Sequence, residues 1–286
     1  MKAIFGTAGN GDLFYKEGNK KSEQMPQWLK GFGLDAYEYQ CGNGVRIGET
    51  SAHSIKENAD AAGIIMSVHS PYYINLATPE EEKRIKSVDY IMQSANAAKM
   101  LGAERVVVHS GALGKLTRTE ATDYAKLTLR IAAEELEKNG FGDIRLCIET
   151  MGKINQLGDL DEVMELCLLN EKFLPTIDFG HLNARWQGTV KTEDDYDKIV
   201  GTIENKLGAE RAKIFHAHFS KIEYTKGGEK KHLTFEDNVF GPEFEPLAKV
   251  LVKRKLAPHI ICESAGTQAE DALEMKQTYN KYLGEQ

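Results

Sequence analysis

Short apolar runs alternate with amphipathic segments along the whole of this sequence. Several runs, such as residues 106–108 (Val-Val-Val), are continuously apolar, which is typical of strands buried on both faces of a parallel sheet. The segments between the runs are long enough to hold a helix each. The pattern predicts eight strands, at residues 2–6, 34–40, 64–69, 105–109, 144–149, 174–178, 213–219 and 259–263.

The segments between the predicted strands have helical periodicity. Residues 78–81 (Thr-Pro-Glu-Glu) have the form of a capping box with proline at the first helical position, and Gly102 is placed to end that helix. A second capping box, at residues 117–120, opens a helix that Gly140 follows. The residues expected on the inner faces of these helices are Ile85, Val88, Met92 and Ala95 in the first, and Tyr124, Leu127 and Ile131 in the second.

A strand followed by a helix, repeated eight times, predicts a parallel sheet with crossover helices. Eight units favour closure into a (β/α)8 TIM barrel, and 286 residues suit one such domain, which typically needs about 250. We therefore expect a single α/β barrel domain over residues 1–286. An open doubly wound sheet is the alternative.

Composition adds little that is specific. No stretch of about 18 uncharged apolar residues occurs, so no membrane span is expected, and the N-terminal run is too short for a signal peptide. No cysteine pair has CxxC spacing, and Cys147 and Cys262 fall within predicted strands, which favours buried free thiols. We expect a cytoplasmic monomer without a membrane partner.

Polar residues of one kind recur at the ends of the predicted strands. In a barrel, the C-terminal strand ends surround one cavity, where active sites lie. Imidazole nitrogens and carboxylate oxygens suit Zn²⁺, Mn²⁺ or Fe²⁺, and clustered buried carboxylates are costly without cations. The sequence thus predicts a metal site formed by His69, His109, Glu149, Asp178 with the following His181, His218 and Glu263.

Three further histidines differ in what they predict. His216 and His218 have period-two spacing and therefore face the same side of their strand, so either can be a ligand and the other its support. His53 lies in a polar helix and is expected at the surface. His259 begins a strand, at the opposite end of the barrel from the ligands, and is expected to be structural.

These motifs together resemble endonuclease IV, the metal-dependent apurinic/apyrimidinic endonuclease family. The most specific piece is residues 69–76 (His-Ser-Pro-Tyr-Tyr-Ile-Asn-Leu), and the resemblance extends in order over essentially the whole chain. The family is a (β/α)8 barrel with three zinc ions that cuts the phosphodiester 5′ to an abasic site in duplex DNA and leaves a 3′-hydroxyl. The other matching pieces are Val108-His109-Ser110-Gly111, Glu149-Thr150, Asp178-Phe179-Gly180-His181, His218-Phe219-Ser220-Lys221 and Glu263-Ser264.

The resemblance implies a role for each ligand. His69 and His109 would bind the first metal, Glu149 would bridge the first and second, and Glu149 and Glu263 would be the catalytic carboxylates. Tyr72, Asn75 and Lys230 would contact the DNA. The second metal would be completed by Asp178, His218 and Glu263, and the third would be bound by His181 and His232.

The chain departs from the family at the third metal. The family places an Asp two residues before its last histidine ligand, and this chain has Lys230 there. A lysine ammonium cannot ligate a metal, so Glu229 is the candidate to take the role, and two or three zinc ions are expected, with Mn²⁺ or Fe²⁺ as alternatives. The run of Lys226, Lys230 and Lys231 is either a solvated loop or a phosphate contact.

Two other functions compete with the nuclease. A sugar isomerase or epimerase of the xylose isomerase-like superfamily would use one metal on Glu149, Asp178, His218 and Glu263. The net charge of −7 fits such an enzyme better, because nucleic-acid binders are usually basic, although bound cations add positive potential. His69, His109 and His232 favour more than one metal. A non-catalytic barrel would have lost ligands, and only one ligand position here is in doubt.

Overall fold

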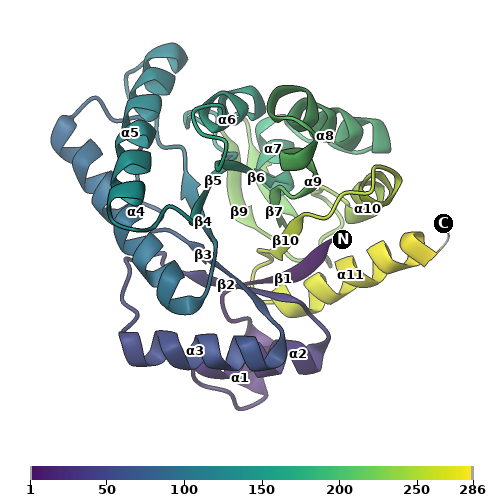
Figure 1. Ribbon diagram of the computed structural model, residues 1–286. Helices are drawn as coiled ribbons and strands as arrows, with labels where there is room; N and C mark the ends of the chain where they lie inside the picture. The colour runs from purple at the N-terminus through teal and green to yellow at the C-terminus, as the bar shows by residue number, and fades with distance from the viewer. Residues whose placement is uncertain (1, 285–286) are drawn as a thin grey trace.

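Eight parallel strands close into a barrel in the computed structural model, which describes residues 2–284 (Figure 1). The order around the ring is β1-β10-β7-β6-β5-β4-β3-β2, and β1 closes it by pairing with both β2 and β10. The barrel strands are β1 (Ile4–Ala8), β2 (Ala36–Gln40), β3 (Ile65–His69), β4 (Arg105–His109), β5 (Arg145–Glu149), β6 (Leu174–Asp178), β7 (His216–Phe219) and β10 (His259–Cys262).

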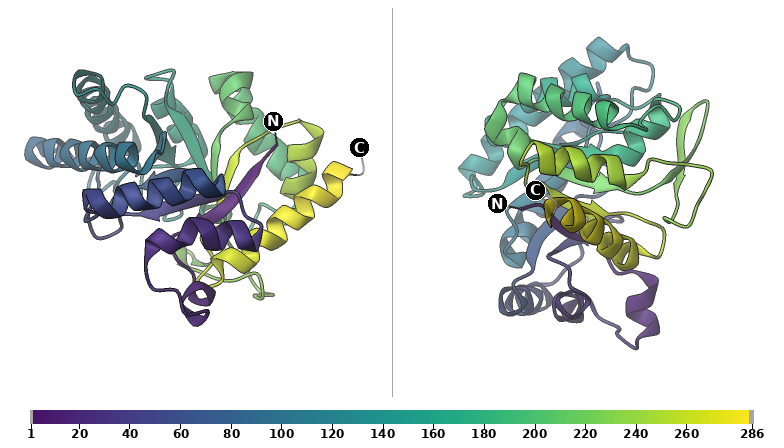
Figure 2. Two further views of the ribbon diagram at one scale, coloured as in Figure 1. Left: turned by 60° about the horizontal axis from the view of Figure 1, so that its bottom comes forward. Right: turned by 90° about the vertical axis from the view of Figure 1, so that its right-hand side faces the viewer.

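Helices surround the barrel, as Figures 1 and 2 show from three sides. The last helix packs against β1 and β10, where the ring closes. The helices are α1 (Asp12–Lys16), the 3-10 helix η1 (Ser22–Gln24), α2 (Met25–Phe32), α3 (Glu49–Ala62), α4 (Glu81–Leu101), α5 (Arg118–Lys138), α6 (Leu160–Cys167), α7 (Phe179–Arg185), α8 (Glu193–Leu207), α9 (Ala209–Lys213), α10 (Phe244–Lys253) and α11 (Gln268–Gly284).

The predicted single (β/α)8 barrel is confirmed, and all eight strands lie where the apolar runs indicated. Six of the eight strands differ from the prediction at one boundary or both, by one to three residues, and the first and seventh differ most. The first strand begins and ends two residues later than predicted, at Ile4 and Ala8. The seventh begins at His216, because Lys213 is the last residue of α9. The last barrel strand ends at Cys262, so Glu263 lies just past it, while the strand ends at His69, His109, Glu149 and Asp178 are as predicted.

The predictions for the two longest helices were partly wrong. Helix α4 begins at Glu81, and the Thr78 hydroxyl accepts a hydrogen bond from the Glu80 amide before the helix starts, so residues 78–81 are not a capping box. Ile85 is 50% exposed and Leu127 is also exposed. Small residues form much of the inner faces instead, which lets both helices lie close to the barrel. Inner positions include Ala95 and Ala98 in α4, and Ala121, Ala125, Leu129 and Ala132 in α5.

A hairpin that the sequence did not predict follows β7. It consists of β8 (Ile222–Thr225) and β9 (Gly228–His232), which pair antiparallel. The hairpin adjoins the loop after β5, because the Glu229 amide donates to the Gly152 carbonyl at 3.1 Å. A Cβ at Gly228 would lie 2.2 Å from that carbonyl oxygen, and its φ is +91°, so glycine is required there. This contact fixes the hairpin at the C-terminal end of the barrel.

Two remaining expectations concern the whole chain. All four cysteines, Cys41, Cys147, Cys167 and Cys262, are free and buried, as predicted for the two within strands. Within residues 2–284, no helix is both long and apolar enough to cross a membrane.

Candidate metal centre

Glu149, the last residue of β5, lies at the middle of the candidate site. Its Oε2 atom is 3.2 Å from His69 Nε2 and 3.1 Å from His109 Nε2. Its Oε1 atom is 3.1 Å from His218 Nδ1 and 3.5 Å from His181 Nδ1. The two oxygens of one carboxylate therefore face two different sets of nitrogens. This is the arrangement that a carboxylate shared by two cations requires.

A second group of possible ligands lies on the Oε1 side of Glu149. It contains Glu149, Asp178, His218 and Glu263, with one ligand atom of each within 4.8 Å of the others. Asp178 caps α7, because its Oδ1 accepts the His181 amide at 2.7 Å. Its other oxygen, Oδ2, is buried and has no hydrogen-bond partner among the described residues. A buried carboxylate oxygen without a donor is costly, and a cation would satisfy it.

A third group joins the barrel to the hairpin. His181, Glu229 and His232 lie close enough to hold one ion, and His181 Nε2 is 3.5 Å from Glu229 Oε2. Lys230 points elsewhere and pairs with Glu223 at 2.5 Å, as Lys231 does at 3.4 Å. Glu229 therefore lies where the family pattern expects an Asp, one residue before the position that Lys230 holds in this chain. Neither lysine is directed at the ligands.

The outward-facing nitrogens of three candidate ligand rings, His69, His181 and His232, have protein partners. His69 Nδ1 donates to the Ser70 carbonyl at 2.8 Å, and His181 Nδ1 donates to the Thr150 carbonyl at 2.9 Å. A carbonyl only accepts, so each of these nitrogens carries its proton. His232 Nδ1 similarly lies 2.8 Å from Ser220 Oγ. Metal-ligating histidines have this kind of partner, which leaves the other nitrogen free to ligate.

The buried carboxylates and imidazoles of the cluster shift one another's pKa values. Burial alone would lower the pKa of His69, but the Glu149 carboxylate outweighs it and raises the pKa to about 9. The pKa of His181 behaves likewise, also reaching about 9, through Asp178 and Glu229. Burial raises the pKa of Asp178 to about 6 despite the opposing charge of His181. Protons and metal ions thus compete for the same atoms, and the donor set suits Zn²⁺, Mn²⁺ or Fe²⁺.

The three groups open into one pocket of about 370 Å³. Tyr72 stands at its rim, 59% exposed. Asn75 does not line it; the Asn75 side-chain oxygen accepts from the Ala77 and Ala112 amides and so joins two loops. Further residues line the pocket that the sequence did not single out, namely Gln40, Gly42, Met151, Lys153 and Gln156. Gln40 ends β2 and the others lie in loops, and no motif marked any of them.

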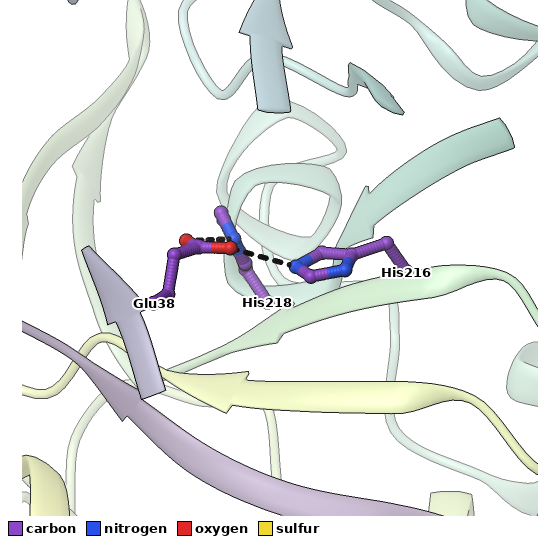
Figure 3. A group of neighbouring side chains, drawn as sticks. All are labelled: Glu38, His216 and His218. Carbon is purple, nitrogen blue, oxygen red and sulfur yellow. Dashed lines mark hydrogen bonds and ion pairs between the residues drawn. The ribbon is translucent and has the colours of Figure 1, made fainter. Parts of the chain in front are cut away.

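One buried residue near the centre was missed altogether. Glu38 lies within β2 and is fully buried, with its carboxylate against His216 and His218 (Figure 3). Its only mark in the sequence is a charged residue inside a strand, flanked by Tyr37 and Tyr39. His216 and His218 do face the same side, as predicted. Only His218 also reaches the Glu149 group, whereas His53 is exposed and His259 starts β10 at the far end.

A closed parallel barrel with metal-ligand side chains at its strand ends defines a class of TIM-barrel proteins. This chain belongs to the Xylose isomerase-like TIM barrel family, whose model matches residues 26–279. An uncharacterized protein of Methanocaldococcus jannaschii is 35% identical over 279 residues, 97% of both chains. A probable endonuclease 4 of Mycoplasma pneumoniae is 28% identical over 174 residues, which are 59% of this chain and 58% of that protein.

Solved structures of two kinds of protein have a similar fold. Endonuclease IV from Thermus thermophilus superimposes with a TM-score of 0.69 at 18% identity, over 99% of this chain and 100% of that one. A D-tagatose 3-epimerase-like protein gives 0.68 at 22% identity, over 88% and 90%. At these identities the likeness establishes the fold alone. The resemblance to endonuclease IV is confirmed by the curated relatives, while the fold is shared with sugar epimerases.

Proposed function

We propose that this protein is a metal-dependent phosphodiesterase that incises duplex DNA 5′ to an abasic site and leaves a 3′-hydroxyl. The observation that carries the proposal is the number of ligand groups. Three groups surround and adjoin Glu149, including His69 with His109 on one side and His181, Glu229 and His232 on the other. A single-metal isomerase needs only the Glu149, Asp178, His218 and Glu263 group. It does not explain why the histidines of the other two groups also lie together.

In this proposal, different residues would bind the metal ions and the DNA. Glu149, the shared ligand, would set the separation of the first two ions, and Glu263 would complete the second. When bound, the divalent cations would supply Lewis acidity and offset charge at the phosphoryl group. The Lys153 ammonium at the pocket would pair with a backbone phosphate. The exposed Tyr72 ring could occupy the space of the missing base.

The test is incision of a duplex that carries one abasic site, with zinc- or manganese-loaded protein. We expect cleavage that chelation abolishes, at the 5′ side only, with a 3′ end that a polymerase extends. The matched undamaged duplex should stay intact. A fully metal-loaded protein that leaves the abasic strand uncut would refute the proposal.

The second candidate is a sugar epimerase or isomerase with one metal. The four-ligand group and the net charge of −7 favour it, because an acidic protein repels DNA. In that case Glu149 and Glu263 would move a proton next to a carbonyl. Elemental analysis separates the two: one tightly bound metal per chain, with ketohexose epimerisation seen by NMR, would favour the epimerase.

A further inference from the structure

The Glu38 carboxylate is held inside the barrel by several donors. Its Oε1 atom lies 2.9 Å from His218 Nε2 and accepts from Gln40 Nε2 at 3.3 Å. Its Oε2 atom accepts from the Ser67 hydroxyl at 2.8 Å. Figure 3 draws an interaction from this carboxylate to each of the rings of His216 and His218. A fully buried carboxylate loses its hydration, and these donors offset that cost only in part, so a buried charge at this place is weak evidence for stability alone.

The two nitrogens of His218 face different groups. Nδ1 is 3.1 Å from Glu149 Oε1 and 3.4 Å from Glu263 Oε2, within the second ligand group. Nε2 faces the Glu38 carboxylate instead. A neutral imidazole has one N–H, and an ionised carboxylate can only accept. Carboxylates thus face both nitrogens. A cation bound by Glu149 and Glu263 would need the Nδ1 lone pair, and the single proton of a neutral His218 would then lie on Nε2, toward Glu38.

We propose that Glu38 is a positioning residue that fixes the tautomer and ring orientation of His218 and makes its Nδ1 a stronger metal ligand. His69 and His181 have backbone carbonyls in the equivalent place, whereas His218 has a charged carboxylate. The stronger acceptor raises the basicity of the opposite nitrogen. This inference rests on the metal centre of the proposed function but not on the choice between nuclease and epimerase.

The same atoms could instead be a metal site of their own, since Glu38, His216 and His218 lie close together. Two observations favour positioning. Both Glu38 oxygens already accept hydrogen bonds, and a metal here would need the Nε2 lone pair of His218 while Nδ1 serves the other group. His216 Nε2 is 3.0 Å from Glu38 Oε2 but is not aligned for a hydrogen bond. His216 thus lies at ion-pair distance from the carboxylate, whose hydrogen bonds come from Ser67 and Gln40.

The first experiment compares Glu38→Gln with Ser67→Ala. Glu38→Gln keeps the shape but removes the charge that faces His218, whereas Ser67→Ala removes a different donor to the same carboxylate. Zinc affinity is measured by competition with a chromophoric chelator. We expect Glu38→Gln to bind zinc about 10- to 100-fold more weakly at its second ion, with an unchanged number of ions at saturation, and Ser67→Ala to differ little. Wild-type affinity in a folded Glu38→Gln protein would overturn the proposal.

The second experiment needs no variant and so survives a folding failure. ¹⁵N-histidine NMR of the zinc-loaded protein reports which nitrogen of His218 carries the proton, and we expect Nε2–H with Nδ1 bound to metal. Coordination through Nε2, or loss of one zinc per chain in His216→Phe, would show that the cluster is itself a metal site and refute positioning. Failure of abasic-site incision with normal zinc binding would refute the nuclease alone.

Discussion

Replacing Glu229 by alanine tests the assignment of the third ligand group directly. Glu229 Oε2 lies 3.5 Å from His181 Nε2, and the group has three protein ligands. Structural zinc sites with four ligands bind with about 10–16 kcal/mol, so one ligand corresponds to about 3 kcal/mol. That is a loss of roughly 100-fold or more in affinity for one ion. The other two ions should be retained, because Glu229 belongs to neither of the groups that share Glu149.

Lys230 supplies the matched control. Its ammonium pairs with Glu223 at the exposed face of the hairpin, away from the ligands. Lys230→Ala and Lys230→Asp should therefore leave the metal content unchanged. The assay is metal analysis after dialysis against a graded chelator series, with circular dichroism to check folding. Loss of an ion in Lys230→Ala, a gain in affinity in Lys230→Asp, or full retention in Glu229→Ala would refute the assignment.

Three further outcomes are expected. Glu149→Gln should lower incision by orders of magnitude, because its charge serves two ligand groups, and near-normal incision would show that the shared role is wrong. Tyr72→Ala should weaken binding of an abasic duplex about tenfold in a band-shift assay, with metal content unchanged, whereas Tyr73→Ala serves as the neighbouring control. Glu162→Gln should lower the free energy of unfolding by about 1–2 kcal/mol, since the Glu162 carboxylate accepts from Arg118 and from two backbone amides. Burial opposes ionisation of Glu162, but these donors, Arg118 first, lower its pKa. Its contribution is thus present above the usual glutamate range and lost as the pH falls below it, so urea titrations of wild type and variant should converge in acid, and a constant gap would contradict the assigned pKa.

The barrel and the placing of most candidate ligand residues together could be predicted because both depend on repetition. The eight apolar runs recur at regular spacing, and His69, His109, Glu149, Asp178 and Glu263 follow from where each run ends. Such positions are set by the chain's local pattern and by the common direction of parallel strands. Nothing about distant contacts is needed to place them at one end of the barrel.

Other parts depend on contacts that no local pattern encodes. Glu38 lies in mid-strand, and its partners His216 and His218 are far along the chain. The hairpin has few apolar residues, and its place depends on the contact of Gly228 with Gly152. Register within the hairpin decides that Glu229, and not Lys230, faces His181. The helix faces were only partly predicted: Val88 and Ala95 are buried as expected, whereas Ile85 and Leu127 are exposed and several alanines pack inward with Leu129.

The β8–β9 hairpin contributes to only one of the three candidate ligand groups. The first two ligand groups are built from the barrel strands themselves, so changing them disturbs the framework of the molecule. The third draws Glu229 and His232 from an appendage inserted between β7 and α10. If the proposed centre holds three ions, editing this short segment would change the number bound without altering the barrel strands. A protein engineer could add or remove one metal here while leaving the rest of the scaffold untouched.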